Sequence, residues 1–322
     1  MTSSPIPVLI GPTGIGKSEV ALLLAEQLHA DLLLIDAYKV YRELNIGVTK
    51  PSPSDRQRVP HFGLDILSVF ESGNVEKITT IAAQVIAEPR QSGKPLIVEG
   101  NAPLYLKILF EGMFEGPAED PVLRAALTAE AQEIGVPALH QRLAAVDPAA
   151  ARKIETNDIR RIIRALEVHT LTGQPISLLQ EQWGKLRDPH AFAVVGLRTD
   201  KEYLWERMRS RVSGMLDAGW LDECRQLLAL ETPDRKLART ASQAEGYHQL
   251  FDLIRNGETL EGATRARIEE AIFIGHRQNA RRAMQWYRKW PYVQWVDRTP
   301  DSTVAGLARQ VGNLWRAAGV PC

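Results

Sequence analysis

Cysteine is nearly absent from this chain, and long apolar runs are missing altogether. The two cysteines, Cys224 and Cys322, form no metal-ligand pattern and make a disulfide framework unexpected. No apolar stretch approaches the roughly 20 residues that span a bilayer. The first residues, MTSSPIP, contain no apolar core of a signal peptide. We therefore expect a cytoplasmic protein with no membrane segment.

Net charge is also lacking, because 39 Lys and Arg residues balance 39 Asp and Glu residues. Any nucleic-acid site must then come from local clustering of basic residues. The composition, 44% hydrophobic and 24% charged, is ordinary for a globular enzyme. The 322 residues suffice for one large domain or two.

The strongest motif lies near the N-terminus, in VLIGPTGIGKSEVALLLAEQL. Apolar residues before it predict a buried strand, and those after it recur at helical spacing, as a phosphate-binding loop (P-loop) requires. Glycines let backbone N–H groups face an anion, Lys17 can reach the outer phosphate, and Ser18 can hold Mg²⁺. The residues predicted to bind a diphosphate or nucleotide are Gly11, Pro12, Thr13, Gly14, Ile15, Gly16, Lys17 and Ser18.

Two further apolar runs, DLLLIDAY and PLIVEG, follow helical segments and predict parallel strands in an α/β fold. Residues 116–189 are rich in helical patterns and predict an all-helical insertion. We therefore expect a P-loop core, residues 1–115 and 190–322, with a parallel sheet flanked by helices. AFAVVGLRTD should return to the sheet, TRARIEEAIFIGHRQNARRAMQWYRKW should form a long helix, and VQWVD should form a last short strand.

Ligands of open parallel sheets bind beyond the C-terminal ends of the strands. Gly11, Asp36 and Gly100 each follow a predicted strand, so we expect them to line one crevice. Asp36 can act as a general base or hold Mg²⁺, although an Asp there can also cap a turn. The segment around Glu99 resembles the layout of P-loop kinases, whose third strand can carry an acidic group such as Glu99; a strand-end side chain that faces solvent is an equal alternative.

Basic residues cluster in three places. Arg207 and Arg211 share a helical face and suit a pyrophosphate or an RNA backbone, or else a solvated surface. Arg160, Arg161 and Arg164 lie in the helical insertion. Residues 261–290 carry seven Lys or Arg against three Glu, with Trp286, Tyr287 and Trp290 interleaved. Such a pattern is typical of RNA binding, although core packing also explains some of the aromatics.

Nearly the whole chain resembles the tRNA dimethylallyltransferases, also called tRNA isopentenyltransferases. GPTGIGKSEVA is similar to the family's P-loop, and DAYKVYRELNIGVTKPS to its D-S-x-Q-V-Y-x-x-x-x-I-G-T-A-K-P segment. VPHFGLDI, NDIRRIIRALEVHTLTGQPIS and RMRSRVSGMLDAGWLDE also have counterparts. EGYHQL and HRQNARRAMQWYR resemble the closing G-Y-x-x-L and T-R-Q-Y-A-K-R-Q-x-T-W-F-R.

The resemblance implies transfer of a dimethylallyl group from dimethylallyl diphosphate to N6 of adenosine 37, beside the tRNA anticodon, by a monomeric enzyme. It implies Asp36 as general base, and Lys17, Arg211 and Ser18 with Mg²⁺ on the departing diphosphate. The base must leave its stack to react. The implied tRNA contacts, to the anticodon stem-loop, are Asp36, Ala37, Tyr38, Lys39, Ala102, Arg124, Arg160, Arg161, Ile162, Ile163, Arg164, Arg277, Arg281 and Arg282.

The chain departs from the family pattern close to the expected substrates. Ala37 and Lys39 replace Ser and Gln, and Gly100-Asn101-Ala102-Pro103 replaces G-G-T-G. The other departures are Val48-Thr49 for T-A, Glu245 for an apolar residue, and His276 and Asn279 for the Thr and Tyr of T-R-Q-Y. Each lost polar contact costs about 1–3 kcal/mol, which leaves open a weakened paralogue that only binds tRNA. An ATP-dependent small-molecule kinase is a third alternative.

Overall fold

The structure is a computed structural model that describes residues 4–92, 94–112, 116–182 and 191–321. The chain divides into two compact units, residues 110–188 and the remainder. Each unit has its own apolar core. Among the described residues, no helix is both long and apolar enough to cross a membrane.

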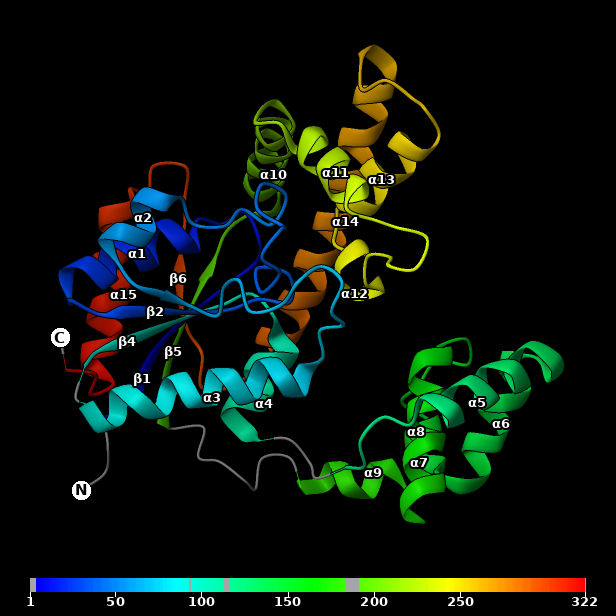
Figure 1. Cartoon of the computed structure of the whole chain (residues 1–322). Coiled ribbons are helices and arrows are strands. Elements are labelled where there is room, and N and C mark those ends of the chain that lie inside the picture. Colours follow the sequence, from blue (N-terminus) through cyan, green and yellow to red (C-terminus); the bar gives the residue numbers. More distant parts are fainter. Residues whose placement is uncertain (1–3, 93, 113–115, 183–190, 322) are drawn as a thin grey trace. The chain divides into compact units, whose positions relative to one another are not determined.

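The larger unit is built on one parallel sheet of six strands in the order β3-β2-β4-β1-β5-β6 (Figure 1). The strands are β1 (Ile6–Ile10), β2 (Asp31–Ile35), β3 (His61–Phe62), β4 (Leu96–Gly100), β5 (Phe192–Arg198) and β6 (Gln294–Asp297). β1, β2 and β4 are buried along their whole length, which explains their mainly apolar sequence. The predicted fold class is confirmed; the two-residue β3 was not predicted.

The helices of this unit are α1 (Lys17–Gln27), α2 (Pro53–Arg58), α3 (Val75–Ser92), α4 (Pro103–Glu111), α10 (Lys201–Asp217), α11 (Trp220–Ala229), α12 (Arg239–Ser242), α13 (Tyr247–Arg255), α14 (Gly262–Tyr287) and α15 (Val304–Ala317). α1 and α15 pack together on one face of the sheet, and α3 runs along the other (Figure 1). α10 packs along α14, and α11 against α13. A second core surrounds the fully buried Trp220.

The smaller unit is entirely helical within its described part. It contains α5 (Pro121–Ile134), α6 (Val136–Val146), α7 (Pro148–Ala151), α8 (Ile159–Thr172) and α9 (Ile176–Leu179), with a 3₁₀ turn at Gln180–Gln182. Asp120, Asp147 and Asp158 cap the starts of α5, α7 and α8 with side-chain hydrogen bonds. Leu139, Leu143 and Ile162 lie fully buried at its centre.

Candidate functional site

The P-loop connects β1 to α1 and wraps its lysine inward. Lys17 is buried, and its Nζ donates hydrogen bonds to the carbonyls of Gly11 (2.9 Å) and Pro12 (3.0 Å). Desolvation lowers the pKa of Lys17 to about 8, against a partial opposing effect of Glu99. The Lys17 ammonium is thus held against the backbone carbonyls at the start of the loop.

Arg298, directly after β6, contacts the P-loop. Its buried guanidinium donates to the carbonyl of Ile15 at 2.7 Å. A Cβ on Gly16 would lie 2.0 Å from Arg298 Nη1, and Gly16 also has φ +93°, so only glycine fits there. Sequence reasoning did not single out Arg298, although a basic residue just past a strand end was a usable signal.

The ends of β2 and β4 bring polar side chains together beside the P-loop. Ser18 Oγ donates to Glu99 Oε1 at 2.7 Å, so Glu99, 6% exposed, faces the P-loop rather than solvent. The amide of Asn101 donates to Asp36 Oδ2 at 2.9 Å. Its carbonyl oxygen lies 3.4 Å from Lys17 Nζ. Of the three residues predicted to line one crevice, Asp36 lines the cavity, whereas Gly11 and Gly100 lie within two positions of lining residues in the chain.

Asp36 is fixed in orientation as well as position. Its Oδ1 accepts hydrogen bonds from the backbone N–H groups of Tyr38 (2.8 Å) and Lys39 (3.1 Å). The turn-capping interpretation of Asp36 is therefore true of one carboxylate oxygen. The other oxygen is aimed by Asn101 and faces the cavity. Asp36 therefore caps a turn and also places a carboxylate oxygen beside the P-loop.

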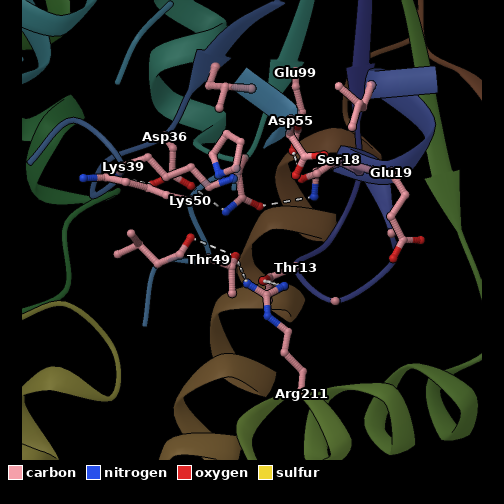
Figure 2. Close-up of a pocket in the computed structure, with 18 of the residues that line it drawn as sticks. Thr13, Ser18, Glu19, Asp36, Lys39, Thr49, Lys50, Asp55, Glu99 and Arg211 are labelled. Atoms are coloured by element: carbon pink, nitrogen blue, oxygen red, sulfur yellow. Dashed lines mark hydrogen bonds between the residues drawn. The ribbon is translucent and has the colours of Figure 1, made fainter. Parts of the chain in front are cut away.

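α10 contributes two arginines from the opposite wall. Arg211 donates to Thr13 Oγ1 at 3.3 Å and to Thr49 Oγ1 at 2.6 Å, and Figure 2 shows its guanidinium reaching both hydroxyls. Arg207 donates to the carbonyl of Gly14 at 3.0 Å. Burial lowers the pKa of Arg211, against the attraction of Asp36 and Glu99. The two arginines therefore face the P-loop rather than forming a solvated surface.

These groups enclose a cavity of about 770 Å³ (Figure 2). Cations and carboxylates are interspersed in its lining, which suits an anionic ligand with a bound metal ion and a nearby proton acceptor. The charged residues of the lining are Lys17, Lys39, Lys50, Arg207, Arg211, Glu19, Asp36, Asp55, Glu99 and Glu206.

The departures from the family pattern include compensating pairs. Ala102 offers no side-chain polar group, but the neighbouring Asn101 supplies the hydrogen bond to Asp36. Val48 lacks a hydroxyl, but Thr49 supplies one to Arg211. Lys39 lines the cavity as a second buried lysine. Ala37 is half-buried beside them.

The departures just before α13 and in α14 lie together as well. The Glu245 carboxylate packs on the backbone of Gly275, where a Cβ would lie 1.9 Å from Glu245 Oε1. Asn279 Nδ2 donates to the other carboxylate oxygen at 3.5 Å. His276 sits between these residues along the chain, and burial and the charge of Arg211 lower its pKa to about 4. It is therefore neutral at physiological pH.

α14 presents two of its predicted tRNA-binding arginines to solvent. Arg281 and Arg282 are exposed, and the Arg281 guanidinium lies 5.7 Å from the centroid of the Trp205 ring. Arg277 is half-buried, 5.6 Å from the centroid of Phe273. Tyr287 and Trp290, which the sequence offered as RNA-stacking rings, are buried in contact with each other. Core packing therefore explains why these two aromatic residues occur in this stretch.

The helical unit uses some of its predicted tRNA-binding residues internally. Glu167 is fully buried and accepts hydrogen bonds from Arg124 (2.8 and 2.9 Å) and Arg164 (2.6 Å). Ile162 and Ile163 are buried in the core of this unit, because the α8 pattern alternates core and surface positions. Their contact with tRNA stays a prediction.

Arg160 and Arg161 are the exposed members of the predicted cluster in the helical unit. Arg161 lies 3.8 Å from Asp158, an exposed pairing that leaves its charge largely available. Both residues therefore stay predicted tRNA contacts, with Arg124 and Arg164 as partners of Glu167 that hold α5 to α8.

Comparison with known proteins gives the family. A family model described as IPP transferase matches residues 39–290. The tRNA dimethylallyltransferase of Syntrophobacter fumaroxidans is 36% identical over 312 residues, covering 96% of this chain and 89% of the relative. That of Pseudarthrobacter chlorophenolicus is 37% identical over 316 residues, covering 96% and 100%.

Solved structures with a similar fold come from proteins with related names. The tRNA isopentenylpyrophosphate transferase of Bacillus halodurans is 27% identical with a TM-score of 0.66, and the match covers 98% of each chain. A eukaryotic dimethylallyltransferase acting on tRNA shares the fold, with 23% identity, a TM-score of 0.78, and coverage of 98% of this chain and 80% of that one. On the strength of the family model and of relatives matched over nearly its whole length, this chain belongs to the IPP transferase family.

Proposed function

We propose that this protein transfers a dimethylallyl group from dimethylallyl diphosphate to N6 of adenosine 37 in tRNA. Its relatives carry the name tRNA dimethylallyltransferase. The observation that carries the proposal is the placement of Asp36 in the same cavity as the P-loop, aimed by Asn101, which also meets Lys17. A proton acceptor and an anion site are thus side by side, as transfer from a diphosphate to an amine requires.

The reaction forms one bond and breaks one. The N6 nitrogen attacks C1 of the dimethylallyl group, the C1–O bond breaks, and its electron pair leaves with the diphosphate. Asp36 accepts the N6 proton. Lys17 and Arg211 stabilise the charge that gathers on the leaving diphosphate, and Arg207 and Arg298 hold the loop that binds it. Burial strengthens each of these interactions.

The donor set beside the P-loop fits Mg²⁺. Mg²⁺ prefers oxygen ligands and is usually held by one or two carboxylates together with substrate phosphates. Ser18, Glu99 and Asp36 offer a hydroxyl and carboxylates at one strand edge. Within the described residues, no group of three or more His, Cys, Asp or Glu residues could hold a metal. Ser18 and Glu99 would therefore hold Mg²⁺ jointly with a diphosphate, and the ion would neutralise developing charge.

The acceptor side of the proposal rests on exposed basic residues. Arg160 and Arg161 of the helical unit, and Arg281 and Arg282 of α14, would neutralise phosphates of the anticodon stem-loop. Lys39 and Tyr38 would meet the reacting nucleotide near Asp36. A monomeric state and a cytoplasmic location remain predictions from the sequence.

Two alternatives make different predictions. A weakened paralogue would bind tRNA without transfer, but Asn101 and Thr49 restore hydrogen bonds that the other departures remove, which favours an active site. A small-molecule kinase would turn over ATP without RNA. The test is mass spectrometry of adenosine 37 in tRNA from cells with and without this protein. An isopentenyl mass on adenosine 37 that disappears with the protein supports transfer, and an unchanged adenosine contradicts it.

A further inference from the structure

Thr49 has a backbone conformation that a β-branched residue rarely adopts. Its φ is +49°, in the left-handed region that favours glycine and, among other residues, asparagine. Such strain persists only where the surrounding structure fixes the backbone, and it concentrates at functional sites. The question is therefore what fixes Thr49, and what its side chain does there.

The turn of residues 45–50 is fixed from the side of α11 and α13. The carboxylate of Glu223 accepts hydrogen bonds from the backbone N–H groups of Asn45 (3.1 Å) and Ile46 (2.9 Å). Gly47 lies flat on Trp220: a Cβ there would be 2.2 Å from the indole ring. Its N–H donates to the hydroxyl of Tyr247 at 3.2 Å.

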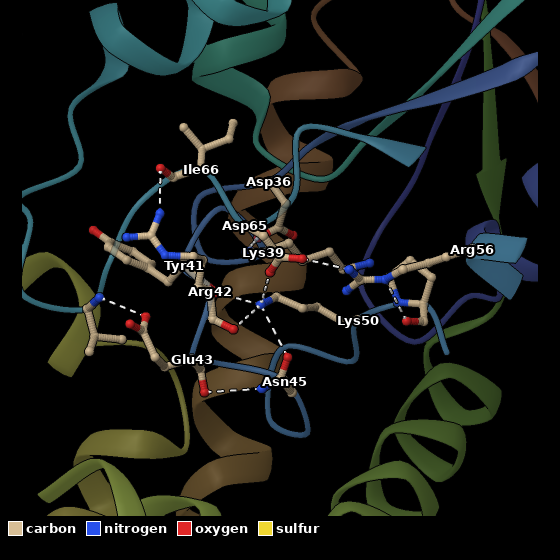
Figure 3. A network of polar contacts seen from close by, with 12 residues as sticks. Asp36, Lys39, Tyr41, Arg42, Glu43, Asn45, Lys50, Arg56, Asp65 and Ile66 are labelled. Atoms are coloured by element: carbon tan, nitrogen blue, oxygen red, sulfur yellow. Dashed lines mark hydrogen bonds and ion pairs between the residues drawn. The ribbon is translucent and has the colours of Figure 1, made fainter. Parts of the chain in front are cut away.

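Lys50 fixes the turn from its other end. Its ammonium, almost fully buried, pairs with Asp65 at 2.6 Å and donates to the carbonyls of Tyr41 and Arg42, and Figure 3 shows these contacts converging on one nitrogen. Arg56 holds the second oxygen of Asp65. The residues on both sides of Thr49 are therefore anchored, and its φ is imposed.

The imposed conformation aims the Thr49 hydroxyl at Arg211. The distance from Arg211 Nη2 to Thr49 Oγ1 is 2.6 Å, and the same hydroxyl donates to the carbonyl of Val48, which leaves an oxygen lone pair for the guanidinium. Arg211 Nε is buried and finds no hydrogen-bond partner among the described residues. The guanidinium is therefore held at its two terminal nitrogens, by Thr49 and by Thr13 of the P-loop.

We propose that Thr49 is a positioning residue: its strained backbone and hydroxyl hold Arg211 in the orientation that binds the diphosphate. This inference rests on the proposed function for the identity of the ligand. The family pattern described above has alanine at this position, so the Thr49 hydroxyl is one of this chain's departures from that pattern. The strained conformation positions Arg211 and does not stabilise the fold. Replacing Thr49 should therefore weaken diphosphate binding without lowering the Tm.

The experiment measures the Kd of pyrophosphate with Mg²⁺ by calorimetry, together with Tm. Thr49→Gly should raise this Kd about 10- to 100-fold while Tm stays at or above the wild-type value. Thr49→Ser should restore the Kd to within about threefold, and kcat should follow the Kd while the KM for tRNA stays constant. His29→Gly is the matched control: His29 has the same φ of +49° but is exposed at the end of α1, so its Kd should not change.

Three results would overturn the inference: an unchanged Kd in Thr49→Gly, a Kd in Thr49→Ser as weak as in Thr49→Gly, or a Tm that falls by several degrees along with binding. The pyrophosphate measurement does not need prenyl transfer. A wild-type protein that binds pyrophosphate but transfers nothing would therefore contradict the proposed function, and the same Kd values would still decide the role of Thr49.

Discussion

Lys17 shows how a single buried residue links the site to stability. Its folded pKa of about 8 lies below the unfolded value of 10.5, so the fold must bury an ammonium at neutral pH. That cost is fully present below pH 8 and disappears as pH rises towards 10.5. Such a desolvation cost is expected at a site where a bound phosphate would compensate the buried positive charge.

We therefore predict that Lys17→Met changes stability in a pH-dependent way. The difference in Tm, variant minus wild type, should be most positive at pH 7 and should decrease steadily between pH 8 and pH 10. Over that range the wild type loses the cost of burying a charged Lys17. Thermal melts of both proteins across this range check it. A pH-independent difference would mean that Lys17 is not desolvated.

Asn101 carries the second residue-scale prediction. Its amide orients Asp36, so Asn101→Gly should lower the single-turnover rate about 10- to 100-fold, the effect of losing a hydrogen bond to a charged group. Adding Ala102→Thr recreates the family's Gly-Thr pair and should recover part of that rate. A double variant no faster than Asn101→Gly would show that Asn101 does not stand in for the family's threonine.

At the scale of elements, α14 carries arginines in two different electrostatic settings. Arg265 pairs with Asp217 and Glu269, and Arg267 pairs with Glu258. Arg281 and Arg282, further along the same helix, are exposed, and the ion pairs found among the described residues do not include them. Carboxylates close to Arg265 and Arg267 reduce the positive charge that these residues present to RNA, so Arg281 and Arg282 should contribute most of the salt-dependent binding.

Replacing Arg281 and Arg282 with alanine should weaken tRNA binding and reduce the log–log salt slope by roughly one to two units. The matched control, alanine at Arg265 and Arg267 in the same helix, should leave the slope nearly unchanged. Binding titrations at several salt concentrations separate the two. Equal slopes for both double variants would show that this end of α14 does not contact phosphate.

The contact of the residue 45–50 turn with α11 provides a stability prediction. Gly47 packs on the buried Trp220 ring, so Gly47→Ala should destabilise the protein by about 1–3 kcal/mol through overpacking. A Cβ on Gly214 in α10 would meet no described atom of another element within 4 Å, so Gly214→Ala should instead stabilise by about 1 kcal/mol. Denaturant unfolding of both variants checks the opposite signs. A Gly47→Ala protein as stable as wild type would show that this contact is not tight.

At the scale of the whole molecule, the sequence predicted what local patterns encode. Buried runs such as Val8–Ile10 are strands because parallel strands covered on both faces are apolar throughout, and the P-loop motif located the site. Arg298 and Thr49 escaped prediction because their roles depend on contacts between distant segments: Arg298 meets Ile15 across 283 positions, and Thr49 meets Arg211 across 162. The position of Arg298 just past a strand end was a usable local signal, but no local pattern gives the distant residue that either side chain contacts.

The helical unit illustrates the same limit. The basic composition of α8 predicted an RNA-binding surface, but burial sorts its residues by helical face: Ile162 faces the core and Arg160 faces solvent. Glu167, in the same helix, forms buried ion pairs with Arg124 and Arg164 inside the helical unit. Composition predicted the surface, and the packing decides which of its basic side chains are exposed.

The most direct test of the account is single-turnover transfer from dimethylallyl diphosphate to one purified tRNA, by wild type and by Asp36→Asn. The substitution keeps the size of the side chain and removes its charge. We predict that wild type places a dimethylallyl group on adenosine 37 and that Asp36→Asn slows this by about 10²–10⁴-fold, with tRNA and pyrophosphate binding nearly unchanged. Equal rates for the two proteins, or no transfer by wild type despite tight tRNA binding, would contradict Asp36 as the base of a prenyl-transfer site.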